Sequence, residues 1–185
     1  MMEEPRLPDA VLKLEIGPYQ INGCLKNIYS SQMVLWRCAA AKARDLLFAW
    51  LEHLLLLAAG KDGYPRQTRF TAADKSWVFD PVDNPTGHMQ KLVEIFQQGQ
   101  TRPVPFFPET SFTFAETLHN RLDPETAICR ARSKWAGNRF DPIDAESENP
   151  YCRQAFGRVD PLGEEWQHLS VEVYEPILCH RRTVK

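Results

Sequence analysis

The order of apolar and polar residues predicts that the chain opens with three β-strands. In VLKLEIG, residues 11–17, apolar side chains occupy every second position, which is typical of a strand with one buried face. The Gly17-Pro18 pair indicates a turn. After it, YQINGCLKNIY, residues 19–29, and MVLWRC, residues 33–38, predict two further strands. Because the links between the three are short, we expect them to pair as an antiparallel meander.

A long apolar segment follows and predicts a helix over about residues 40–59, with Gly60 as its C-cap. Plotted at about 100° per residue, four of its polar side chains gather on one narrow stripe. They are Lys42, Asp45, Glu52 and His53. A helix that is apolar in the other directions should be buried on most sides, with the stripe as its solvated face. The same residue types could also perform acid–base chemistry, so that alternative stays open.

Two short strands and several helices are predicted for the rest of the chain. The strands fall in TRFTA, residues 68–72, and SWVFDP, residues 76–81. Residues 84–99 form an amphipathic pattern, and Asp123 is placed as the N-cap of a later helix. We therefore expect an α/β fold. Its mixed sheet opens with the three-strand meander and is crossed by the long buried helix, and the C-terminal half is helical.

Composition sets limits on the class of protein. The 185 residues fit one domain, which we expect over residues 10–182 after a flexible tail of residues 1–9. The formal net charge of -2 gives no overall basic field for nucleic acid. Five widely spaced cysteines without a CxxC pair argue against disulfides or a zinc site and favour reduced cytosolic thiols. The longest apolar run is too short and too polar to span a bilayer, and the acidic N-terminus is not a signal peptide.

Candidate chemistry is sparse. The five histidines are scattered singly, and no GxSxG, Walker A or GxGxxG motif occurs, so we expect no metal and no cofactor. One basic cluster stands out along the chain. It consists of Arg121, Arg130, Arg132, Lys134 and Arg139. These side chains could contact phosphates, or they could simply form a solvated helix face.

A series of segments along the chain carries a family resemblance. It comprises INGCLKNIY, RDLLFAWLEHLLLLAAG, LVEIFQQGQTRPVPFFPETS, ARSKWAG and ENPYCRQAFGRVDPLGEEWQHLSVEVYEPILCH. In order and spacing, residues 10–182 resemble the C-terminal domain of the RecC (gamma) subunit of exodeoxyribonuclease V, the RecBCD helicase–nuclease. The segments ending WLEHLLLLAAG and PFFPETS are the most specific.

The resemblance implies a PD-(D/E)XK nuclease-like fold that is non-catalytic. It implies a structural and DNA-guiding role in a bacterial helicase–nuclease of the cytoplasm, which acts in double-strand-break repair and recombination. The implied partners are RecB-like and RecD-like subunits, the rest of the RecC chain, and the DNA end or fork. The whole subunit is several times longer than this chain, so the chain corresponds to an excised domain. Chi recognition is not assigned to it.

The residues themselves bear on catalysis. Active nucleases of this class hold Mg²⁺ with an Asp at the end of the second strand and a (Asp/Glu)-x-Lys motif on the third. Lys26 stands about where the first acid belongs, and Trp36 and Cys38 stand where the second acid and the lysine belong. No (Asp/Glu)-x-Lys occurs anywhere in the chain. The site is therefore expected to be degenerate, with no catalytic residue.

Two alternatives remain, and one set of DNA contacts is expected. A cationic Lys26 beside Arg37 would repel Mg²⁺ but attract phosphate, and Arg130, Arg132 and Lys134 are the other candidate phosphate contacts. The first alternative is an active metal-dependent nuclease with relocated acids. Those acids would be Asp74, Asp80 or Asp83. The second is a protein–protein docking module that never touches DNA.

Overall fold

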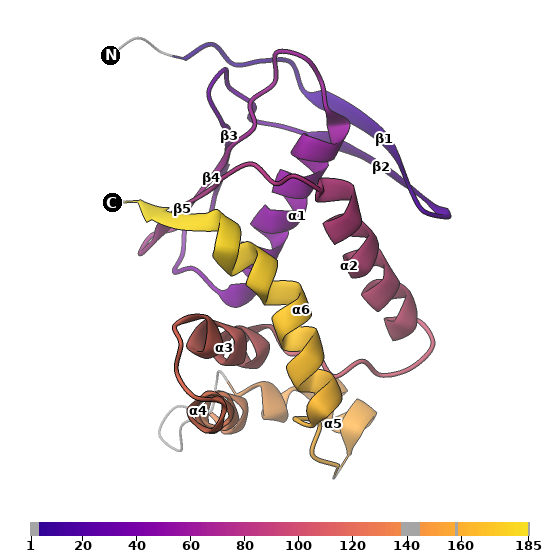
Figure 1. Ribbon diagram of the computed structural model, residues 1–185, viewed down its shortest axis with the longest axis vertical. Helices are drawn as coiled ribbons and strands as arrows, with labels where there is room; N and C mark the ends of the chain where they lie inside the picture. The colour runs from indigo at the N-terminus through magenta and orange to yellow at the C-terminus, as the bar shows by residue number, and fades with distance from the viewer. Residues whose placement is uncertain (1–3, 138–144, 158, 185) are drawn as a thin grey trace. The chain divides into compact units, whose positions relative to one another are not determined.

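The computed structural model describes residues 4–137, 145–157 and 159–184 (Figure 1). The elements in chain order are β1 (Ala10–Ile16), β2 (Tyr19–Leu25), β3 (Met33–Trp36), α1 (Ala43–Ala59), β4 (Thr68–Thr71), β5 (Ser76–Phe79), α2 (Pro85–Gly99), α3 (Pro108–His119), α4 (Pro124–Ala136), the 3-10 helix η2 (Glu146–Glu148), α5 (Pro150–Phe156), α6 (Glu164–His180) and β6 (Arg181–Val184). The expected α/β fold and helical C-terminal half are confirmed, apart from the short final strand.

The chain forms two compact units, which are described separately. The sheet unit comprises Met1–Val93 and His180–Lys185, and the helical unit comprises Glu94–Cys179. The expected single domain of residues 10–182 therefore contains two contact-dense parts. Residues 1–3 of the expected tail lie outside the described residues. Within the described part of the tail, the Leu7 N–H donates to the Ile28 carbonyl at 2.8 Å.

The strands of the sheet unit form two sheets. β1 and β2 pair antiparallel around the predicted turn, where Gly17 has a φ of 56°. The other sheet has the order β3-β4-β5-β6, in which β3 and β4 run parallel and the remaining pairs are antiparallel. The mixed sheet is thus confirmed. Its parallel pair is connected through α1, as a crossover between parallel strands requires.

The predicted three-strand meander is wrong, because β3 joins β4 and not β2. Asn27 explains the break: its φ of 56° is left-handed, which ends the extended backbone of β2. What remains of the expected pairing is a bridge between Ile28 and Met33 and a 3.0 Å hydrogen bond from the Val34 N–H to the Asn27 carbonyl. The Met33 N–H instead donates to the Gln67 carbonyl at 2.9 Å, at the start of the β4 pairing.

Helix α1 supplies much of the core of the sheet unit. Leu46, Trp50 and Leu54 are buried, and Leu56 joins an apolar cluster with residues of β1, β2 and β3. The expectation of a long helix is confirmed, but burial on most sides is not: the buried residues of α1 lie on one half of its circumference, and Phe48 on the other half is 56% exposed. The expectation of a solvated polar stripe is wrong at His53, which is fully buried.

The helical unit is held by a second apolar cluster, which includes Trp166 of α6. Its members also come from α3 and α4, including Phe114, Ala127 and Ala131. The start of α3 is completed from a distance: the carboxylate of Glu146 accepts the N–H groups of the second and third residues of α3, at 3.1 and 2.8 Å. Such acceptors satisfy donors that a helix N-terminus leaves without intrahelical partners.

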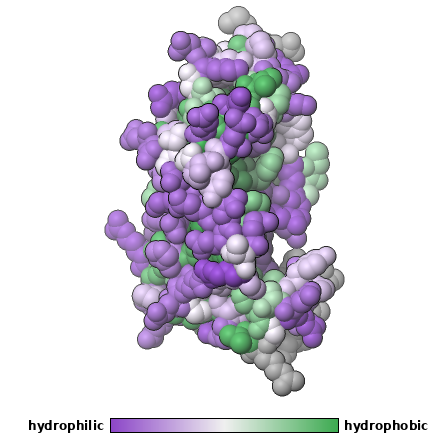
Figure 2. All heavy atoms as spheres, turned by 90° about the vertical axis from the view of Figure 1, so that its right-hand side faces the viewer, coloured by the Kyte–Doolittle hydropathy of each residue, from purple (hydrophilic) through white to green (hydrophobic). Residues whose placement is uncertain are grey.

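The surface is mixed in character. On the face drawn in Figure 2, hydrophilic residues predominate and hydrophobic ones form separate spots. Several large apolar side chains are nevertheless exposed among the described residues. They are Val11, Trp36, Phe48, Phe96, Leu122, Tyr151 and Val159. Among the helices that the structure describes, none combines the length and apolar character needed to cross a bilayer.

Candidate nucleic-acid interface

The ends of β2 and β3 carry the three residues that the sequence places where metal ligands would be expected. Lys26 follows the last residue of β2 and is exposed. Trp36 ends β3 and keeps 59% of its surface exposed. Cys38 lies two residues further on as an exposed free thiol. The positions thus present one cation, one aromatic ring and one thiol to solvent, and no carboxylate.

Arg37 is engaged in the protein. Its Nη1 donates to both carboxylate oxygens of Asp45, at 2.5 and 2.6 Å. The backbone N–H of Lys42 donates to the same carboxylate at 2.9 Å, so Asp45 also completes the N-terminus of α1. The side chains of the pair are only 26% and 16% exposed. Each charge is therefore compensated by the other, which leaves Asp45 poorly suited to Mg²⁺ and Arg37 poorly suited to phosphate.

The acids considered as relocated ligands do not assemble. Asp80 accepts from Gln67 Nε2 at 2.8 Å and from Arg182 Nε at 3.1 Å. Asp74 accepts the Ala41 N–H at 2.7 Å, and Asp83 is exposed. Within the described ranges of the chain, one group of three potential metal ligands occurs, and it contains none of these three acids.

His53 forms a buried hydrogen-bond network with Thr68 and the backbone of Asp80, which the sequence did not predict. His53 Nε2 lies 3.1 Å from the Asp80 carbonyl, and His53 Nδ1 lies 3.0 Å from Thr68 Oγ1. Because a carbonyl only accepts, Nε2 carries the proton and Nδ1 accepts from the threonine hydroxyl. Burial, with the charge of His180 as a smaller cause, lowers the pKa of His53 to about 4. His53 is therefore a neutral structural side chain at physiological pH.

The basic residues of α4 do not form one patch. Arg130 and Lys134 are four residues apart and share a helix face, whereas Arg132 projects about 200° away from Arg130. Arg132 also forms an ion pair with Asp160 at 2.6 Å. Arg139 of the expected cluster lies outside the described residues. These residues belong to the helical unit, whereas Lys26 and Arg37 belong to the sheet unit. Their assignment to DNA stays a prediction.

Comparison with known proteins gives a consistent picture. A family model described as the RecC C-terminal domain matches residues 1–119. The chain is 26% identical over 176 residues to the RecBCD enzyme subunit RecC of Escherichia coli K12, with 90% of this chain and 15% of that protein covered. It is 30% identical over 195 residues to the RecC subunit of Mycolicibacterium smegmatis, with 91% and 17% covered.

A third relative extends the match to another organism. The RecC subunit of Buchnera aphidicola from Schizaphis graminum is 24% identical over 180 residues, with 91% of this chain and 16% of that protein covered. The chain thus spans about a sixth of the length of the curated relatives it matches. Since the family model covers well over half of the 185 residues, the family resemblance is confirmed. The chain belongs to the RecC C-terminal domain family.

Proposed function

We propose that this domain is a non-catalytic, structural and DNA-guiding part of the RecC-like subunit of a bacterial exodeoxyribonuclease V. In this role it serves double-strand-break repair and recombination. Membership of the RecC C-terminal domain family supports the place in such an assembly. The observation that carries the non-catalytic part is the Arg37–Asp45 pair, because it ties up a carboxylate close to the expected metal site in an internal ion pair.

The likeness to PD-(D/E)XK nucleases is part of the proposal. A mixed sheet with a helix connecting its parallel strands is compatible with that class. In an active member, carboxylates would gather at the strand ends around Mg²⁺. At the corresponding positions this chain has Lys26, Trp36 and Cys38, none of which is an oxygen ligand of the kind Mg²⁺ prefers.

The DNA-guiding part rests on Lys26 and Trp36. Both are exposed: Lys26 follows β2 and Trp36 ends β3. The bond from the Val34 N–H to the Asn27 carbonyl links the segments that carry them. An ammonium group can contact phosphate, and an exposed indole can stack on an unpaired base. A cation and an aromatic ring carried by neighbouring segments would suit the place where a duplex is opened. Arg37 contributes less to this proposal than the sequence suggested, because Asp45 compensates its charge.

Lys26→Glu is expected to weaken binding of the chain to a forked DNA by about tenfold at low salt. Each phosphate contact that is lost should also reduce the slope of log affinity against log salt by about 1. Fluorescence anisotropy at several salt concentrations measures both quantities. Lys75→Glu, an equal charge change in the exposed turn between β4 and β5, is the matched control and should have a smaller effect.

The same affinity measurement distinguishes the DNA-guiding role from the alternative of a protein–protein docking module. If Lys26→Glu and the double replacement of Lys26 and Arg37 by Glu both leave the affinity unchanged, the DNA-guiding part is wrong and a docking role is favoured.

The proposed protein partners are RecB-like and RecD-like subunits and the remainder of a RecC chain, in the bacterial cytoplasm. The chain should co-purify with a co-expressed RecB-like subunit, and failure to retain that subunit would count against this assembly.

A further inference from the structure

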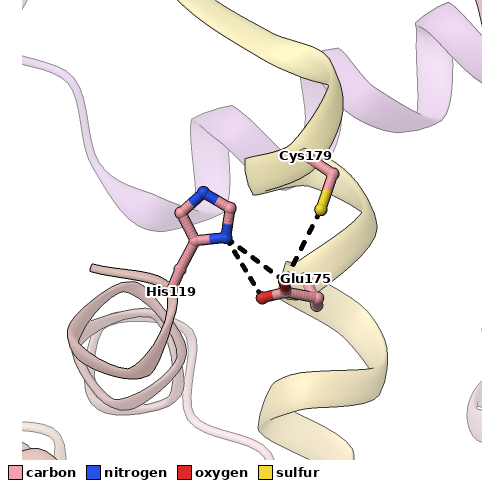
Figure 3. A group of neighbouring side chains, drawn as sticks. All are labelled: His119, Glu175 and Cys179. Carbon is pink, nitrogen blue, oxygen red and sulfur yellow. Dashed lines mark hydrogen bonds and ion pairs between the residues drawn. The ribbon is translucent and has the colours of Figure 1, made fainter. Parts of the chain in front are cut away.

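Three side chains of the helical unit converge in a way that the proposed function does not use (Figure 3). His119 lies in the last turn of α3, and Glu175 and Cys179 lie one turn apart on α6. His119 Nδ1 is 3.2 Å from Glu175 Oε1, and Cys179 Sγ is 3.5 Å from the same oxygen. One ligand atom from each residue falls within 4.8 Å of the other two.

The two separations from Glu175 suit a small tetrahedral ion. Zinc binds nitrogen, oxygen and sulfur at roughly 2.0–2.3 Å, so tetrahedral ligand atoms lie about 3.3–3.7 Å apart. The two separations that involve Glu175 Oε1, 3.2 and 3.5 Å, are close to that range. The ligand types also select the ion. Imidazole and thiolate suit zinc, whereas Mg²⁺ and Ca²⁺ prefer all-oxygen sites.

We propose that His119, Glu175 and Cys179 bind one Zn²⁺, with solvent as the fourth ligand, and that the ion ties the end of α3 to the last turns of α6. This inference goes beyond the proposed function and does not depend on it. His119 and Cys179 are exposed and Glu175 is partly exposed, so the ion can enter from solvent. On binding, the Cys179 thiol releases its proton to the buffer and coordinates as the thiolate.

A simple ion pair between His119 and Glu175 is the competing explanation. The same helix offers a comparison, because His168 Nε2 lies 3.7 Å from Glu172 Oε2 at a spacing of four residues. Among the described residues, no third potential metal ligand groups with that pair. His168→Ala is therefore a matched control, since it removes a histidine beside a carboxylate of α6 without touching the proposed site. Cys129→Ser is the matched thiol control, because Cys129 is also exposed on a helix.

Cobalt substitution tests the site directly. When the metal-free 185-residue chain is titrated with Co²⁺, a thiolate-to-cobalt charge-transfer band should saturate at one ion per chain. The band should be absent in Cys179→Ser and retained in Cys129→Ser and His168→Ala. His119→Ala should weaken Zn²⁺ binding, measured by competition with a chromophoric chelator, by at least about tenfold through the loss of a direct ligand.

A second readout needs no variant. Saturating Zn²⁺ should protect Cys179, and not Cys129, from alkylation by iodoacetamide, with the modified peptides quantified by mass spectrometry. The proposal is overturned if the cobalt band persists in Cys179→Ser, if His119→Ala binds Zn²⁺ as tightly as the unaltered chain, or if Zn²⁺ leaves Cys179 as reactive as before. Any of these results would show that the three residues do not together form a zinc site.

Discussion

Trp166→Ala is expected to lower the free energy of unfolding by about 3–5 kcal/mol, the usual cost of removing a buried tryptophan. Its side chain is fully buried, and its ring centroid lies 4.8 Å from that of Phe114. Its indole N–H donates to Ser111 Oγ at 3.0 Å. The substitution therefore removes packing from α3 and α6 together and leaves a cavity that their backbones can close only in part.

Urea unfolding followed by circular dichroism measures this loss. Trp36→Ala removes the same atoms from a side chain that is 59% exposed, and it should cost well under about 1 kcal/mol. Equal destabilisation by the two substitutions would show that the burial of Trp166 adds no stability to the helical unit. A second variant, Trp166→Phe, should fall between them because it keeps most of the ring volume.

The second large effect is a loss of stability in acid that depends on His53. Its pKa is lowered from 6.5 to about 4 in the folded chain, so the unfolded chain binds the additional proton between these values. Stability is therefore full above about pH 6.5 and falls as the pH decreases towards 4. The part due to His53 should be about 2 kcal/mol between pH 7 and pH 5.

Substitution isolates this contribution from other titrating groups. Asp80 and His180 are the charged neighbours that act on His53, and His88 has its own pKa lowered, chiefly by burial. His53→Gln keeps polar atoms near Thr68 and the Asp80 carbonyl but cannot titrate, so its unfolding free energy should vary less with pH. His168→Gln, at an exposed position, should retain the dependence of the unaltered chain. Identical pH slopes for His53→Gln and the unaltered chain would contradict the assignment.

Local features of the fold were largely predictable from the sequence. The alternation of residues 11–17 predicted β1, and Gly60 was correctly placed as the left-handed C-cap of α1. Asp123 was correctly placed as an N-cap, since its carboxylate accepts the Thr126 N–H at 2.9 Å. Such features depend on neighbours within a few residues, and the sequence pattern reports those neighbours directly.

Features set by distant partners were not predictable in the same way. The partner of β3 is β4, about 35 residues further along the chain, and short links alone suggested β2. The final strand, β6, has a charged four-residue sequence and owes its conformation to pairing with β5. His53 was placed on a solvated stripe because Thr68 and the Asp80 carbonyl, which satisfy its ring, come from other elements.

In the candidate site, too, residue identities were predictable from the sequence and contacts between distant residues were not. The absence of acids at Lys26, Trp36 and Cys38 could be read from the sequence, because it is a matter of residue identity. The engagement of Arg37 by Asp45 required the structure, since eight residues and a turn separate them. The convergence of His119 with Glu175 and Cys179 joins positions 56 or more residues apart, and no spacing rule connects them.

The central claim, that this RecC-family domain is non-catalytic, is tested most directly by incubating the purified chain with linear DNA and either Mg²⁺ or Mn²⁺. We expect no cleavage above that of a metal-free control. The positions where the proposed nuclease likeness calls for acids hold Lys26, Trp36 and Cys38, and Asp80 is held by Gln67 and Arg182. Metal-dependent cleavage that is abolished by Asp80→Asn would contradict the account.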